Sequence, residues 1–231
     1  MQIHGLQKTT LLDYPGLVAA TIFSGGCNLR CPFCHNMNLV KHPESEPLLS
    51  EEEIFSFLNS RKNLLDGICI TGGEPTLQKD LIPFIYKIKE LGYRVKLDTN
   101  GTFPNVLKTL IQNQLIDYVA MDIKSSPDTY AAVCGLKTID LHPIQESISL
   151  LINGTLPYEF RTTVIAQYHN EAIFHEIGNM IRGAENYYLQ SFQDSEYVED
   201  HTLCACSKKD LLHYKDLLTQ YVRHVELRGV D

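Results

Sequence analysis

The chain has 231 residues, and 44% of them are hydrophobic, which is an ordinary fraction for a globular protein. Twenty basic and twenty-eight acidic residues give a formal net charge of −8, which disfavours an electrostatic nucleic-acid surface. No apolar run approaches the roughly 20 residues that span a bilayer, so we expect no membrane anchor. This length suits one α/β domain with a substantial core, and we expect a single domain over residues 1–231.

Short β-rich runs alternate with amphipathic helical patterns along the chain, which is typical of βα units and a parallel sheet. Residues 1–16 resemble an extended leader that packs on the first strand, and residues 222–228 are expected to add a terminal strand. The runs that predict the six central strands are 18–23, 67–71, 94–98, 118–124, 159–165 and 187–192.

The segments between these runs carry helix signals. Apolar residues recur at helical spacing through 81–91, and Gly92 predicts the end of that helix. Ser50 followed by Glu53 is the pattern of a capping box at the start of an earlier helix. We interpret these apolar stripes, and similar ones nearer the end of the chain, as core packing.

Six βα units are too few for a closed eight-stranded barrel. We therefore expect an α/β fold of the partial, laterally open (β/α)6 TIM type. An open side would suit a macromolecular substrate.

Three cysteines lie in one short loop after the first predicted strand. Cys27, Cys31 and Cys34 form a C-x3-C-x2-C pattern. Iron–sulfur clusters are normally held by four thiolates, so three would leave one iron of a [4Fe–4S] cluster open to a substrate or cofactor. A structural zinc site with His35 as fourth ligand is the alternative, although a neighbour of Cys34 closes a tetrahedron poorly.

Disulfides are not expected among the cysteines. Seven is an odd number, no signal peptide precedes them, and the loop cysteines lie too close together for unstrained bridging. We therefore expect a reducing compartment, the cytoplasm.

The cysteine loop has an aromatic residue, Phe33, directly before its last cysteine, and in this form it resembles the cluster loop of the radical S-adenosylmethionine (SAM) enzymes. The run Gly72-Gly73-Glu74-Pro75 resembles their SAM-binding motif. Three further segments resemble the glycyl-radical-enzyme activases, most closely those of anaerobic ribonucleoside-triphosphate reductases. These segments are 9–16, 97–101 and 121–124, within a similarity that runs from Ile3 to about Gly229.

The predicted site lies at the carboxyl ends of strands, where this architecture places chemistry. Gly72 and Gly73 would let the backbone approach a ligand closely, which in this family is the amino group of SAM. Thr99 and Asn100, after the third predicted strand, are included among the SAM-binding residues.

Asp98 ends the third predicted strand, and Asp122 and Lys124 end the fourth, two residues apart and so on one face. The resemblance assigns Lys124 to the SAM ribose or carboxylate, whereas a purely structural interpretation is an ion pair or a solvated strand end. Asp98 and Asp122 resemble a pair that holds a monovalent cation in pyruvate formate-lyase activases, with carbonyls near Thr99 and Ala120. Two nearby carboxylates repel, so a cation or Lys124 is expected beside them.

The resemblance also implies contacts from the later strands. Arg161 matches by order an arginine that contacts SAM, and its planar guanidinium suits a carboxylate. Gln190 stands where relatives carry a histidine, so that contact is not carried over directly. His35 and Asn36 would present backbone groups to adenine, and Phe33 would give it an apolar contact or fill the core.

Four cysteines lie outside the loop. Cys69 lies in an apolar strand and is expected to be a small buried hydrophobic residue. Cys134 has no evident partner. Cys204 and Cys206 could belong to a second cluster, but two thiolates fall short of such a site, so we expect none.

The resemblance implies reductive cleavage of SAM at the [4Fe–4S] cluster to a 5′-deoxyadenosyl radical, with flavodoxin or ferredoxin as electron donor. That radical would abstract the α-hydrogen of a glycine on a partner glycyl-radical enzyme, most narrowly an anaerobic ribonucleoside-triphosphate reductase. A pyruvate formate-lyase-type activase is one alternative, and a small-molecule enzyme such as a 7-carboxy-7-deazaguanine synthase is another. A metal-binding or electron-transfer module without SAM chemistry would leave Gly72–Pro75 and Lys124 without a purpose.

Overall fold

The computed structural model describes residues 1–230. Its strands follow the order β1 to β8 in one sheet. The chain divides into two compact units. The first comprises residues 1–28, 36–99 and 103–119, and the second comprises residues 29–35, 100–102 and the chain from Ala120 onward.

The first unit is built on four strands. β1 (Ile3–Thr10) runs antiparallel to β2 (Ala19–Ser24), and β3 (Gly67–Gly72) and β4 (Arg94–Thr99) then add in parallel. Their apolar side chains are fully buried, for example Ile22, Ile70 and Leu97. The remaining elements are α1 (Met37–Lys41), η1 (Pro43–Ser45), α2 (Glu51–Ser60), η2 (Pro75–Leu77), α3 (Leu81–Glu90) and α4 (Pro104–Gln112).

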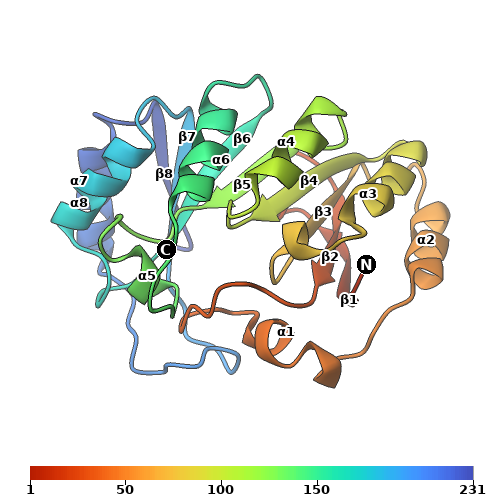
Figure 1. Ribbon diagram of the computed structural model, residues 1–231, viewed down its shortest axis with the longest axis horizontal. Helices are drawn as coiled ribbons and strands as arrows, with labels where there is room; N and C mark the ends of the chain where they lie inside the picture. Colours follow the sequence, from red (N-terminus) through yellow and green to blue (C-terminus); the bar gives the residue numbers. More distant parts are fainter. Residues whose placement is uncertain (231) are drawn as a thin grey trace. The chain divides into compact units, whose positions relative to one another are not determined.

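The second unit contains the later strands. β6 (Tyr158–Val164), β7 (Asn186–Ser191) and β8 (His224–Arg228) pair in parallel, and β5 (Tyr118–Asp122) begins in the first unit and ends in the second. The helices α7 (Glu171–Met180) and α8 (Lys208–Leu218) pack against each other, and α8 also contacts β8 (Figure 1). The unit also holds α5 (Tyr130–Val133) and α6 (His142–Ile152).

The prediction of an α/β fold with an open sheet is confirmed. All six predicted strands are present within two residues of their expected ends, and β1 and β8 are the two ends of the strand order among residues 1–230. The capping box is also confirmed, because the Ser50 hydroxyl accepts from the Glu53 amide at 3.2 Å and the Glu53 carboxylate accepts from the Ser50 amide at 2.8 Å. One boundary is wrong, since β5 ends at Asp122 and Lys124 lies beyond it.

Across residues 1–230, no helix has both the length and the apolar character that a membrane span requires.

Candidate functional site

In the first unit, the turn after β3 is held against the backbone that leads into the cysteine loop. The Gly73 amide donates to the Ser24 carbonyl at 2.8 Å, and the Glu74 amide donates to the Gly26 carbonyl at 2.8 Å. A Cβ on Gly73 would lie 2.0 Å from the Gly26 oxygen, and Gly72 has a φ of +112°. Both glycines are therefore needed for this close backbone approach, whatever ligand the turn also meets.

Side chains lock the same turn. The buried Glu74 carboxylate accepts from the Thr99 hydroxyl at 2.8 Å and from the Thr76 amide at 3.0 Å. The Asn36 side-chain amide donates to the Gly72 carbonyl at 2.8 Å. The structure thus brings together five predicted site residues of this unit: Asn36, Gly72, Gly73, Glu74 and Thr99. Pro75 starts η2 directly after them.

Asp98 has a partner that the sequence analysis did not consider. Its carboxylate forms an ion pair with Lys96, which lies two residues earlier on β4, and it accepts from the Thr71 hydroxyl at 3.3 Å. The Cys69 sulfur is 3.7 Å from the same carboxylate. Lys96 therefore supplies a positive charge at Asp98, and the monovalent cation stays a prediction that electrostatics no longer requires.

In the second unit, Asp122 lies between two cations. Its Oδ1 accepts from Arg161 Nε at 2.9 Å, and its Oδ2 accepts from Lys124 Nζ at 2.9 Å. Burial would raise the pKa of Asp122, but the charges of Arg161 and Lys124 outweigh it and lower that pKa to about 2. Two positive charges and one negative charge leave the three side chains with a net charge of +1.

Burial alone would lower the pKa of the Lys124 ammonium. The negative charges of Asp122 and Cys31 outweigh burial and hold that pKa above its ordinary value. Lys124 therefore stays charged at neutral pH, as an anion-binding role requires.

Of the loop cysteines, Cys27 belongs to the first unit, and Cys31 and Cys34 belong to the second. The Cys34 amide donates to the Cys31 carbonyl at 3.0 Å, which fixes the turn between them. A hydrogen bond from Cys134 and the charge of Lys124 lower the pKa of Cys31 to about 7, although burial opposes this. Because the thiolate is the metal-binding form, Cys31 is suited to ligation.

No three His, Cys, Asp or Glu side chains within residues 1–230 are grouped as ligands for a single metal ion. An iron–sulfur cluster does not need that grouping, because each cysteine binds a different iron. Three soft sulfur donors in one loop fit such a cluster.

His35 and Gln190 line one cavity of about 300 Å³, together with Thr163 and Ser191 at the carboxyl ends of β6 and β7. The His35 ring stacks on Phe192, with 5.9 Å between ring centroids, and its Nε2 lies 2.6 Å from the Gln193 carbonyl oxygen. The structure therefore brings His35 and Gln190 to one polar cavity.

Two other predicted residues make mainly internal contacts. Phe33 is 4% exposed and lies 6.3 Å from Tyr168 between ring centroids, as a core residue does. The Asn100 side chain accepts from the Thr102 amide at 3.0 Å and from its hydroxyl at 2.6 Å, which closes a local turn.

Cys134, for which the sequence showed no evident partner, hydrogen bonds through its side chain to Cys31. The prediction that Cys69 is buried is confirmed, although it also contacts charged groups. Cys204 is exposed, and its sulfur lies 3.6 Å from the Thr202 carbonyl.

His169 is a further residue that the sequence analysis missed. It is 3% exposed, accepts at Nδ1 from the Ile165 amide at 3.0 Å, and donates from Nε2 to the Lys124 carbonyl at 3.0 Å. This ring holds the backbone that carries Lys124.

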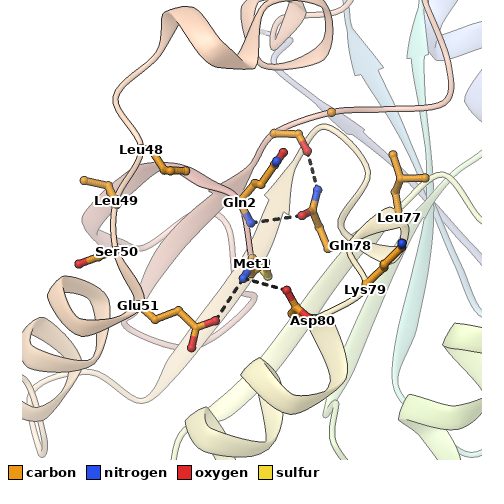
Figure 2. A pocket seen from close by; sticks show the side chains of 12 residues that line it. Met1, Gln2, Leu48, Leu49, Ser50, Glu51, Leu77, Gln78, Lys79 and Asp80 are labelled. Atoms are coloured by element: carbon orange, nitrogen blue, oxygen red, sulfur yellow. Dashed lines mark hydrogen bonds and ion pairs between the residues drawn. The ribbon is translucent and has the colours of Figure 1, made fainter.

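A second cavity, of about 550 Å³, lies in the first unit beside the N-terminus (Figure 2). The Met1 ammonium lies 3.1 Å from Glu51 and 3.6 Å from Asp80, and Gln78 donates to the Gly25 carbonyl at 2.6 Å. None of the predicted site residues lines this cavity.

The chain matches the model of the Radical SAM superfamily over residues 21–178, and it therefore belongs to that family. It is 33% identical to the putative glycyl-radical enzyme activating enzyme MJ1227 of Methanocaldococcus jannaschii, over 99% of this chain and 96% of that protein. The protein is accordingly a radical SAM enzyme that uses a [4Fe–4S] cluster and SAM.

Two solved structures share the fold. A domain of the pyruvate-formate lyase-activating enzyme from Bacteroides vulgatus superimposes with a TM-score of 0.58 at 19% identity, over 71% of this chain and 99% of that one. Streptococcus suis SuiB bound to S-adenosylmethionine superimposes with a TM-score of 0.70 at 14% identity, over 89% of this chain and 49% of that one.

Proposed function

We propose that the protein is a glycyl-radical-enzyme activase whose partner is an anaerobic ribonucleoside-triphosphate reductase. The observation that carries the activase assignment is the match to MJ1227, which spans nearly the whole of both chains. The narrower choice of partner rests on the resemblance of segments 9–16, 97–101 and 121–124. Flavodoxin or ferredoxin is the proposed electron donor.

In this proposal, the thiolates of Cys27, Cys31 and Cys34 hold the cluster. When bound, the cluster supplies the electron that cleaves SAM to a 5′-deoxyadenosyl radical. The backbone of Gly72 and Gly73 would meet the SAM amino group.

The net positive charge of the group formed by Asp122, Lys124 and Arg161 supports binding of the SAM carboxylate. The cavity beside His35 and Gln190 would take the adenosine part. Its walls would orient the reacting carbon and exclude water from it.

The activase assignment is tested by locating the radical. The protein is mixed anaerobically with SAM, a low-potential reductant and the anaerobic reductase of the same organism. We expect a carbon-centred doublet in the electron paramagnetic resonance (EPR) spectrum. With α-deuterated glycine in the reductase, deuterium should enter 5′-deoxyadenosine and the doublet should collapse, because its splitting comes from the remaining α-hydrogen.

A matched control replaces the radical glycine of the reductase with alanine, which should abolish the doublet while slow uncoupled SAM cleavage continues. A doublet only on another glycyl-radical enzyme would correct the partner and keep the activase. Consumption of a free metabolite, with no protein radical on any such partner, would establish a small-molecule enzyme instead.

The cluster ligands are tested separately. Cys27→Ala, Cys31→Ala and Cys34→Ala should each abolish the iron–sulfur absorbance of the reconstituted protein, because each removes one of three ligands. Cys204→Ala and Cys206→Ala are the controls and should retain it. A stoichiometric zinc ion without that absorbance would contradict the assignment.

A further inference from the structure

The buried thiol of Cys134 lies against the cysteine loop and has no part in the proposed activity. Cys134 is 0% exposed and Cys31 is 7% exposed, so water does not compete for the space between them. Their side chains are hydrogen bonded. A thiolate bound to iron carries no proton, so in the loaded protein Cys134 must be the donor and the Cys31 sulfur the acceptor.

The backbone keeps the two cysteines together. The Cys134 amide donates to the Tyr130 carbonyl at 3.0 Å, and the Cys134 carbonyl accepts from the Arg30 amide at 2.9 Å. The residue is therefore tied to α5 on one side and to the cysteine loop on the other. Since Arg30 directly precedes Cys31, the loop cannot move away from Cys134 without breaking this bond.

Gly135 makes the close approach possible. Its φ is +68°, and a Cβ placed on it would lie 2.1 Å from the Arg30 carbonyl oxygen. No other residue type fits there without moving the backbone. The turn after α5 is therefore shaped to press against the loop.

We propose that Cys134 is a positioning residue that donates an S–H hydrogen bond to the cluster ligand Cys31 and thereby raises the reduction potential of the cluster. Reduction adds one electron to the cluster and makes its sulfur ligands more negative. A hydrogen-bond donor at a ligand sulfur stabilises that reduced form, and such donors are among the factors that set cluster potentials. The proposal rests on the assignment of Cys31 as a ligand in the proposed function.

The test is an anaerobic redox titration of the reconstituted protein, followed by the EPR signal of the reduced cluster. Cys134→Val has a similar volume and no donor, and it should shift the potential to a more negative value. Cys134→Ser restores a donor and should keep the potential near that of the wild type. Cys69→Val is the matched control, a buried cysteine that contacts Lys96 and Asp98, and it should leave the potential unchanged.

An unchanged potential in Cys134→Val would overturn the proposal, as would an equal shift in Cys134→Ser. Loss of the cluster in both variants would also overturn it, because Cys134 would then be needed for assembly rather than for tuning. If the proposed cluster site were wrong, Cys31→Ala would retain its cluster, and this result separates a failure of the site from a failure of the role proposed for Cys134. If Cys31→Ala loses its cluster while the reduction potential of Cys134→Val is unchanged, only this inference fails and the proposed function stands.

Discussion

Each unit contains a Lys–Asp ion pair beside a buried cysteine, and the two pairs differ in their exposure and in the arginine that joins the second. In the first unit, Lys96 and Asp98 form an ion pair and are 2% and 14% exposed. In the second unit, Lys124 and Asp122 are 17% and 28% exposed, and Arg161 adds a second cation. The first pair is nearly closed to solvent, and we call it the closed pair. The second pair, the open pair, is joined by a second cation and keeps partial access to solvent. Both pairs contain the same residue types, so access to solvent and the nearby guanidinium are what make the second pair a candidate binding site.

The largest effect on stability is expected from breaking the closed pair. Asp98→Ala would leave the Lys96 charge buried without its carboxylate, which costs about 3–5 kcal/mol of unfolding free energy. Asp122→Ala should cost less, about 2 kcal/mol, because the second pair is more exposed although two cations lose their shared carboxylate. Urea unfolding of both variants measures the difference.

The double variant Lys96→Met/Asp98→Leu is the control for this prediction. It removes both charges and should recover most of the stability that Asp98→Ala loses. An equal or larger cost for Asp122→Ala would show that exposure does not separate the two pairs.

The next effect concerns binding by the open pair. Lys124→Ala should weaken SAM binding roughly ten- to a hundred-fold, because a hydrogen bond to a charged group contributes about 1.5–3 kcal/mol. The cluster absorbance should stay unchanged, which shows that the variant is folded. Equilibrium binding of SAM under anaerobic conditions is the measurement.

Lys89→Ala is the matched control for Lys124→Ala, since Lys89 forms an ion pair with Asp117 at 2.7 Å in the first unit. It removes an ion-paired lysine and should leave SAM affinity unchanged. If Lys124→Ala binds SAM as the wild type does, the open pair is only structural.

Much of the fold could be predicted from the sequence, because alternating β runs and helical stripes are local signals. The proximity of Asp122 and Lys124 could also be predicted, because the two residues are only two positions apart. The Lys96–Asp98 pair was missed although its signal was present, since residues two apart on a strand share a face. The contacts of Cys134 with Cys31 and of His169 with Lys124 could not be predicted from the sequence, because they join segments distant along the chain and no periodicity indicates such a contact.

The smallest effect tests what holds the open pair in place. Lys96 lies within β4, whereas Lys124 lies beyond the end of β5. The Lys124 carbonyl accepts a hydrogen bond from His169. Because Nδ1 accepts a hydrogen bond and Nε2 donates one, the ring must be neutral. Burial lowers the pKa of His169 below its ordinary value of 6.5, although its backbone hydrogen bonds oppose this. As the pH falls below 6.5, the unfolded chain takes up the proton first, so the folded state loses stability.

One such group changes the unfolding free energy by at most about 1.4 kcal/mol per pH unit. At pH 7.5, His169→Gln should be less stable than the wild type by about 1–3 kcal/mol, because two buried backbone groups lose the ring to which both are hydrogen bonded. It should also lose less stability than the wild type between pH 7.5 and pH 5.5. Urea unfolding at several pH values measures both effects, with the exposed His142→Gln as the control that should behave as the wild type. An unchanged pH dependence in His169→Gln would mean that folding does not lower the pKa of the ring, which would contradict the neutral ring bound at both nitrogens. The backbone of Lys124 would then owe its position to other groups, such as the Tyr130 hydroxyl 3.3 Å from the Lys124 amide.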